Sequence, residues 1–110
     1  MKVIVATHEP HLRGSVAPEF EVAPYYLAVD TLAGRTTLFL HPVQFQVAYT
    51  PAGLVQRLRT FAPDAVVAGS FSAEVHQAAS SLRIELLVAH GRAADAVDQC
   101  AGASLPGSRT

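Results

Sequence analysis

One segment decides the fold: Val16-Ala17-Pro18-Glu19-Phe20-Glu21-Val22-Ala23-Pro24-Tyr25-Tyr26-Leu27-Ala28-Val29-Asp30. Its first half contains two prolines, which interrupt regular backbone hydrogen bonding and predict a loop. Its second half, from Tyr25 to Asp30, is apolar and aromatic, as expected of a strand that is buried in a sheet. The segment therefore predicts a loop that leads directly into a buried strand.

The composition is that of one compact domain rather than of a disordered chain. The 110 residues are 50% hydrophobic and 15% charged, and a chain of this length usually forms one core. We expect a single domain over residues 1–101. Residues 102–110 are rich in Gly, Ser and Pro and lack periodicity, so we expect a flexible C-terminal tail there.

Charge, hydropathy and cysteine content exclude several classes of protein. The formal net charge is −1 and the Lys and Arg residues are scattered, so we expect no nucleic-acid partner. No apolar run approaches the roughly 20 residues that cross a bilayer, and the N-terminus is too short for a secretory signal, so we expect a cytoplasmic protein. Cys100 is the only cysteine, which excludes an internal disulfide and a cysteine-ligated cluster within one chain.

The rest of the sequence predicts alternating strands and helices. Apolar and β-branched runs predict strands over residues 2–7, 25–30, 36–41, 64–69 and 83–89, with a hairpin turn at residues 32–35. Capping residues and helical spacing predict helices over residues 51–61, 73–81 and 93–101. This order is typical of a three-layer α/β sandwich, a mixed five-stranded sheet with helices on both faces.

In such a sheet, the loops that follow the parallel strands meet at one rim, where ligands usually bind. The three loops expected there are residues 7–24, 69–72 and 89–91. We expect Asp30 and Asp64, in contrast, to lie at opposite rims, so that they do not share a metal ion.

Three runs resemble the dinitrogenase iron-molybdenum cofactor biosynthesis family, small proteins that bind or carry nitrogenase cofactor and its iron–sulfur precursors. They are the loop-to-strand segment 16–30, Pro63-Asp64-Ala65-Val66-Val67-Ala68-Gly69, and Leu82-Arg83-Ile84-Glu85-Leu86-Leu87. The resemblance implies a ribonuclease H-like fold, a role in nitrogen fixation, and an iron-molybdenum cofactor or iron–sulfur precursor bound at the strand-end rim. This chain has Glu19-Phe20-Glu21 where the family usually has His-Phe-Gly.

Six residues of the three loops are candidates for contact with such a ligand: His8, Glu19, Phe20, Gly69, Ser70 and His90. Neutral imidazoles bind transition metals, whereas a carboxylate such as Glu19 prefers harder ions. No set of side chains is predicted to form a metal site, because Pro10 prevents the helix that would bring His8 and His11 together.

Each candidate also has a plainer interpretation. His8 and His90 can be solvent-exposed histidines, and Glu19 and Glu21 solvated loop carboxylates. Phe20 can belong to the core instead of forming a stacking platform with the tyrosines of the next strand. Outside this set, we expect His41 and His76 to be exposed.

The sequence predicts binding rather than catalysis, because a ribonuclease H-type nuclease needs a carboxylate in its first strand and Val3-Ile4-Val5-Ala6 has none. The leading hypothesis is a non-catalytic carrier that holds a metallocluster or related anion through loop backbone amides and a few side chains. Cofactor-assembly proteins would then be its partners. The alternative is a module of the same fold that has lost the cofactor and acts through protein contacts, as a homodimer.

Overall fold

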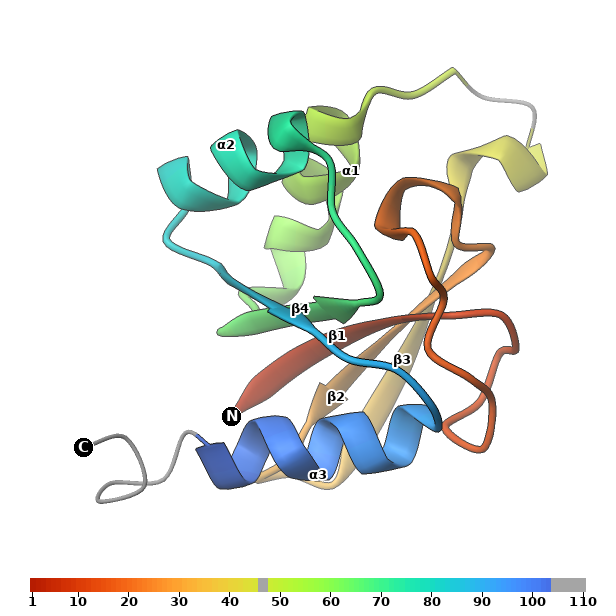
Figure 1. Ribbon diagram of the computed structural model, residues 1–110, viewed down its shortest axis with the longest axis vertical. Coiled ribbons are helices and arrows are strands. Elements are labelled where there is room, and N and C mark those ends of the chain that lie inside the picture. The colour runs from red at the N-terminus through yellow and green to blue at the C-terminus, as the bar shows by residue number, and fades with distance from the viewer. Residues whose placement is uncertain (46–47, 104–110) are drawn as a thin grey trace.

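The computed structural model describes residues 1–45 and 48–103, in which one sheet lies between two layers of helices (Figure 1). The strands are β1 (Lys2–Thr7), β2 (Tyr25–Asp30), β3 (Arg35–Leu40), β4 (Ala65–Ala68) and β5 (Glu85–Val88). The helices are α1 (Pro51–Leu58), α2 (Ala73–Ser81) and α3 (Ala93–Ala103), with short 3₁₀ turns η1 (Phe20–Val22), η2 (Pro42–Phe45) and η3 (Arg59–Phe61). The predicted three-layer α/β architecture is confirmed.

The sheet has the strand order β3-β2-β1-β4-β5. The pairs β1–β2 and β2–β3 are antiparallel, whereas β1–β4 and β4–β5 are parallel. This is the ribonuclease H-like topology, and it confirms the mixed sheet with parallel first, fourth and fifth strands.

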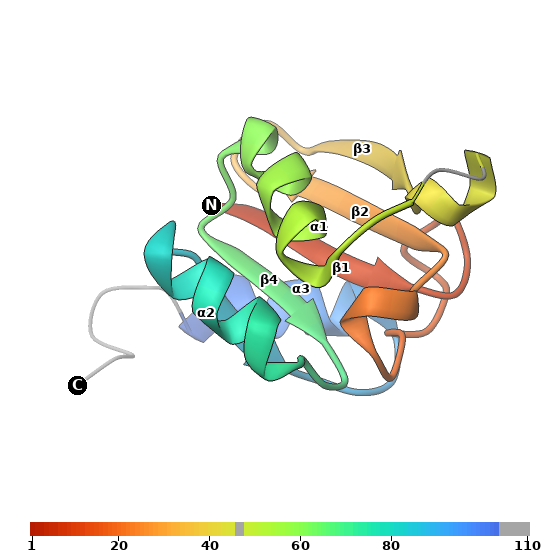
Figure 2. The same ribbon diagram turned by 90° about the horizontal axis from the view of Figure 1, so that it is seen from above.

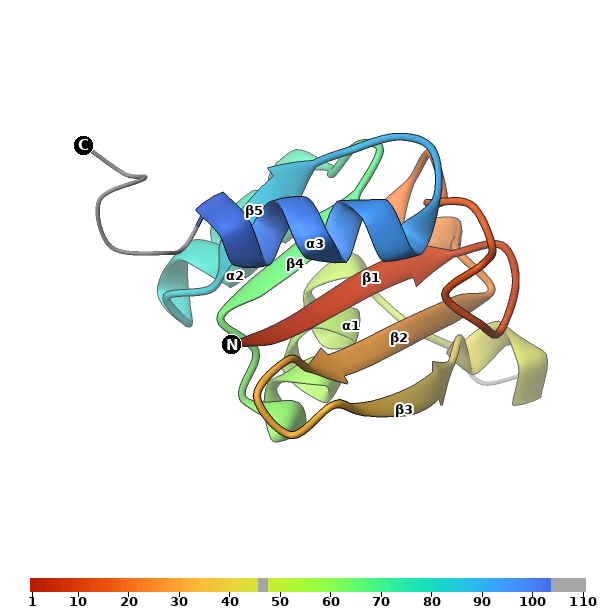
Figure 3. The same ribbon diagram turned by 90° about the horizontal axis from the view of Figure 1, so that it is seen from below.

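The central strand β1 separates two cores. Ile4 and Ala6 pack with α1 and α2 on one face, while Val3 and Val5 pack with α3 on the other. Figures 2 and 3 show these two helix layers from above and below. All four side chains have no exposed surface. A continuous apolar strand of this kind needs a helix layer on each side, because its side chains alternate between the two faces.

Local capping places the starts of α1 and α2 where the sequence predicts them. The Thr50 Oγ1 accepts a hydrogen bond from the Gly53 amide, and the Ser72 Oγ accepts one from the Val75 amide. Both side chains satisfy amides that have no partner within the first helical turn. The predicted first helix is divided, since α1 ends at Leu58 and continues as the 3₁₀ turn η3.

Several element ends differ from the prediction: β3 is shifted by one residue toward the N-terminus, and β4 and β5 are shorter than predicted. The last helix extends to Ala103, so the first two residues of the expected tail belong to α3, and residues 104–110 lie outside the described residues. The fifth strand begins at Glu85 rather than Arg83, because Arg83 has a φ of 59° and its amide donates to the Ser80 carbonyl. Arg83 therefore belongs to the turn after α2.

None of the helices among the described residues is long and apolar enough to span a membrane.

Truncating Ile4 to alanine is expected to lower the free energy of unfolding by about 2–5 kcal/mol, because it leaves a cavity in the α1–α2 core. Urea denaturation followed by circular dichroism measures the loss. Leu32→Ala is the control, since this side chain is 91% exposed and its truncation should change the stability by less than about 0.5 kcal/mol. Equal losses in the two variants would contradict the two-core description.

Candidate functional site

The three loops predicted at the carboxyl ends of the parallel strands do meet, and their backbones are hydrogen-bonded to each other. The Gly69 amide donates to the Ala17 carbonyl at 2.8 Å, and the Phe20 amide donates to the Ser70 carbonyl at 3.1 Å. On the other side, the Val16 amide donates to the Gly91 carbonyl at 2.8 Å. The loop before β2 is thus fixed between the ends of β4 and β5.

Gly69 and Ser70 hold this loop at close range. A Cβ atom on Gly69 would lie 2.7 Å from both the Cα and the carbonyl oxygen of Pro18, closer than such atoms can approach. The Ser70 hydroxyl is exposed and donates to the same Pro18 carbonyl at 2.7 Å. The glycine is therefore needed for the contact between the two loops, independently of any ligand.

Phe20 has no exposed surface and contributes to the core. Its ring centroid lies 5.2 Å from that of Tyr26 and 5.7 Å from that of Phe71. The Tyr26 hydroxyl donates to the Phe20 carbonyl at 2.7 Å, and its burial raises the tyrosine pKa far above the usual range, with smaller contributions from Tyr49 and Glu21. The core interpretation of Phe20 thus replaces that of a stacking platform.

The two glutamates of the loop have different environments. Glu19 is exposed, whereas Glu21 is half-buried and its Oε1 accepts a hydrogen bond from the Ser72 amide at 3.1 Å. A carboxylate in this position also interacts favourably with the positive end of the α2 dipole. Glu21 therefore fastens the loop to α2, where the sequence had suggested only a solvated carboxylate.

The prediction that His41 is exposed is wrong. It is 1% exposed, and its Nε2 lies 2.6 Å from the Glu21 carbonyl oxygen. Its ring contacts that of Tyr49 edge-on, with the centroids 4.4 Å apart. The Glu21 carbonyl belongs to a loop 20 positions earlier in the chain, so this burial depends on a long-range contact that the local sequence does not reveal. His76 is exposed, as predicted.

Short antiparallel pairings between three loop segments place side chains on the outer surface of the rim. Thr7 pairs with Val16, and Ser15 pairs with Arg92, in antiparallel bridges, while the His8 amide donates to the Ser15 carbonyl at 3.2 Å. Thr7 and Val16 are buried, whereas the alternate residues His8, Ser15 and Arg92 are exposed. We call these three outward-facing residues the His8–Ser15–Arg92 row.

Two members of this row, Ser15 and Arg92, were missed by the sequence analysis. Their pairing joins segments 77 positions apart, and no local pattern signals it. His90 is exposed next to Gly91, which has a φ of 90°, and is a neighbour of the row along the chain. No ion pair of His8 or Arg92 occurs among residues 1–45 and 48–103.

The backbone amides expected to hold an anion already have acceptors within the protein. At α3, the Ala93 and Ala94 amides donate to the carbonyls of Gly14 and Leu12. At α1, the Ala52 amide donates to the Glu74 carboxylate. Together with the Ser72 amide, which donates to Glu21, these four amides are occupied within the protein, so side chains of the rim would contribute to holding an anion. Within the described part of the chain, no three His, Cys, Asp or Glu side chains gather as a metal site.

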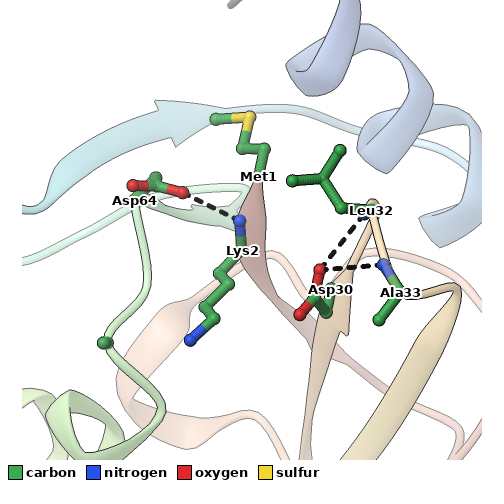
Figure 4. Close-up of a pocket in the computed structure, with 7 residues that line it drawn as sticks. Met1, Lys2, Asp30, Leu32, Ala33 and Asp64 are labelled. Carbon is green, nitrogen blue, oxygen red and sulfur yellow. Dashed lines mark hydrogen bonds between the residues drawn. The ribbon is translucent and has the colours of Figure 1, made fainter.

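Asp30 and Asp64 lie at the same rim of the sheet, opposite the loop cluster, so the prediction of separate rims is wrong. Because β2 is antiparallel to β1, the last residue of β2 pairs with Lys2 at the start of β1, next to the start of β4. Both carboxylates line an open pocket of about 560 Å³ (Figure 4).

Each carboxylate in this pocket accepts hydrogen bonds from backbone amides. The Asp64 Oδ2 accepts from the Lys2 amide at 2.8 Å, and the Asp30 Oδ1 accepts from the amides of Leu32 and Ala33 at 3.1 and 3.2 Å. The Ala33 hydrogen bond is the main reason that the pKa of Asp30 is lowered, with help from the Leu32 amide, the amino terminus and Lys2. The carboxylates therefore have structural roles in the hairpin turn and the β1–β4 connection.

Cys100 lies beneath the surface between α3 and the sheet. It is buried, and it lines an apolar cavity of about 180 Å³ together with Val67, Leu87 and Ala96. Burial raises the pKa of the thiol, and Glu85 and Asp64 add to this effect. A thiol with a raised pKa has little thiolate and reacts slowly.

Comparison with known proteins supports the fold but gives no match in sequence. No protein-family model matches the chain, and no curated protein matches it. The chain is similar to the apo form of the orange protein from Desulfovibrio gigas, with a TM-score of 0.84, 18% identity, and coverage of 96% of this chain and 90% of the other.

Two further solved structures share the architecture. One is a putative NifB protein from Thermotoga, TM1290, assigned to the DUF35 family, with a TM-score of 0.76, 17% identity, and coverage of 97% of this chain and 89% of the other. The other is PH0822, with a TM-score of 0.77, 17% identity, and coverage of 93% and 91%. Identities this low show the fold alone, and the predicted resemblance is confirmed at that level.

Substituting Gly69 by alanine is expected to lower the free energy of unfolding by about 1–3 kcal/mol, because the new methyl group overlaps the backbone of Pro18. Ser70→Ala is the matched control, since it removes one hydrogen bond to the same carbonyl and should cost about 1 kcal/mol or less. Hydrogen exchange at the Phe20 amide should accelerate more in the glycine variant. The close loop contact would be refuted by two variants of equal stability and equal exchange.

Because the pKa of Asp30 is lowered in the folded protein, the free energy of unfolding should depend on pH in the acidic range. The ionised form is favoured in the folded state, so its contribution is complete above the ordinary aspartate pKa of 3.8 and is lost as the pH falls through the lower pKa of the folded state. Asp30→Asn should therefore weaken the protein at neutral pH, and its difference from wild type should shrink in acid. Urea midpoints across this range test it, with Asp98→Asn, an exposed carboxylate of α3, as the control. A constant difference at every pH would exclude this role.

Proposed function

We propose that this protein is a non-catalytic carrier that holds an anionic metal cluster of the iron-molybdenum cofactor or iron–sulfur precursor class at the carboxyl-end rim. The observation that carries the proposal is the His8–Ser15–Arg92 row, which presents an imidazole, a hydroxyl and a guanidinium on one exposed face. The similarity of fold to a putative NifB protein and to the orange protein supports the class of ligand.

The row has the chemistry that an anionic cluster requires. Neighbouring positions across paired strands are about 5 Å apart, so the row spans about 10 Å. Arg92 supplies a permanent positive charge with several N–H donors, Ser15 supplies a hydroxyl donor, and a neutral His8 can bind an iron or molybdenum atom directly. His90, two residues before Arg92, extends the same surface.

The local charge also favours an anion more than the sequence alone indicates. Two loop carboxylates would repel a negatively charged cluster. Glu21 is directed to the Ser72 amide and the half-buried Glu9 to the Ser15 amide, so Glu19 is the only carboxylate of residues 7–24 that is exposed. The repulsion that the Glu21 carboxylate would exert on an anion at the rim is therefore reduced.

A carrier fits the site better than an enzyme or a cluster-building scaffold. Among residues 1–45 and 48–103 no group of three metal-ligating side chains is assembled, so a cluster would be bound preformed through its surface atoms. The carboxylates Asp30 and Asp64 lie at the far rim and are hydrogen-bonded to backbone amides.

The test is anaerobic titration of the protein with isolated iron-molybdenum cofactor and, separately, with a synthetic [4Fe–4S] cluster, followed by gel filtration and absorbance of the protein peak. Wild type should elute brown. Arg92→Ala and His8→Ala should each bind about tenfold or more weakly, as expected for loss of a charge-assisted contact. Arg59→Ala, which removes an exposed arginine of η3, is the control and should bind as wild type does.

Two results would overturn the proposal. One is a colourless wild-type peak with both clusters. The other is a brown peak whose affinity is the same in the row variants and in the Arg59 control, because binding would then occur elsewhere.

A further inference from the structure

The edge strand β3 lacks the features that usually prevent a strand from pairing with another chain. It is the last strand of the sheet, and all six of its residues pair in register with β2, without a bulge. Natural edge strands are protected by lysines, prolines, bulges or very short length. The sequence Arg35-Thr36-Thr37-Leu38-Phe39-Leu40 has none of these protections, and its only charge is at its first residue.

One face of β3 is also without a helix layer. Leu38 pairs with Leu27, which pairs with Val5, so all three lie on the α3 side of the sheet. In Figure 3, α3 crosses β1, β4 and β5 and does not reach β3. On this face Leu27 and Val29 of β2 are still buried, so the cover ends at β3. Leu38 is accordingly 43% exposed. The other face is filled, since Phe39 packs against Phe61 with the ring centroids 6.5 Å apart.

We propose that β3 binds β3 of a second copy of this chain in an antiparallel pair centred on Leu38. This register places Leu38 opposite Leu38 of the second copy, Thr36 opposite Leu40, and Thr37 opposite Phe39. Opposed residues then share a face of the joined sheet, as antiparallel pairing requires. Leu38 and Leu40 of both copies then form one continuous apolar strip, centred on the two-fold axis that runs perpendicular to the joined sheet.

The charge pattern of the strand is compatible with this pairing and selects its register. Residues 36–40 are the five paired positions and Arg35 falls outside them, so the two arginines lie at opposite ends of the interface and do not repel each other. A six-residue strand is about 20 Å long, and the two sheets join as one of ten strands. Because a two-fold pair uses both β3 edges, the assembly closes as a dimer and does not grow into a fibre.

The competing edge, β5, is less suited to the same contact. It has four residues, begins with the charged Glu85 and is flanked by α3 and α2. The observations therefore favour a second copy at β3, independently of what the loop rim binds.

Sedimentation velocity and light scattering on the complete chain test the proposal. Wild type should be a dimer at micromolar to millimolar concentration. Leu38→Lys should be a folded monomer by circular dichroism, because two ammonium groups would meet at the axis. Leu32→Lys, which adds the same charge to the exposed hairpin turn, is the control and should remain dimeric.

Cross-linking fixes the register. Leu38→Cys should form an intermolecular disulfide under mild oxidation, since directly opposed strand residues lie within disulfide range, whereas Leu32→Cys should not. The native Cys100 is buried and does not compete. A wild-type monomer at millimolar concentration overturns the proposal. So does a dimer that persists in Leu38→Lys, or one that Leu38→Cys fails to cross-link.

Discussion

The burial of β1 from Val3 to Thr7 is the constraint on which the rest of the structure depends. Its side chains point alternately into two cores, and neither face tolerates solvent. The strand therefore needs α1 and α2 on one side and α3 on the other, and it needs neighbours on both edges. It pairs with β2 in one direction and β4 in the other, which places the loops after β1, β4 and β5 at one rim.

Most of the fold could be predicted because its signals are local. Apolar runs marked the strands, and Thr50 and Ser72 marked two helix starts through hydrogen bonds within a few residues. The errors came from distant contacts. His41 is buried by a loop 20 positions earlier, and Asp30 and Asp64 share a rim only because β2 runs antiparallel to β1.

The sequence predicted where the candidate site lies, but it did not predict which residues form its exposed surface. The topology brought the three loops together as predicted, yet it assigned their residues to different tasks. Gly69 and Ser70 hold Pro18, Glu21 caps the loop before α2, and Phe20 fills the core. The His8–Ser15–Arg92 row exists because Ser15 pairs with Arg92. This pairing depends on the paths of two loops in the folded chain, and no sequence motif signals it.

The internal capping of the rim amides has a consequence for how this surface attracts a ligand. Amides buried at a helix start act at short range and resist screening by dissolved ions. Here the amides of Ala52, Ser72, Ala93 and Ala94 already have protein acceptors, and solvated side chains such as Arg92 contribute the attraction that these amides do not. Ions screen such charges over about 8 Å at physiological ionic strength. Capture of an anion at this rim would therefore weaken steeply as salt rises, and release would need no rearrangement of the fold.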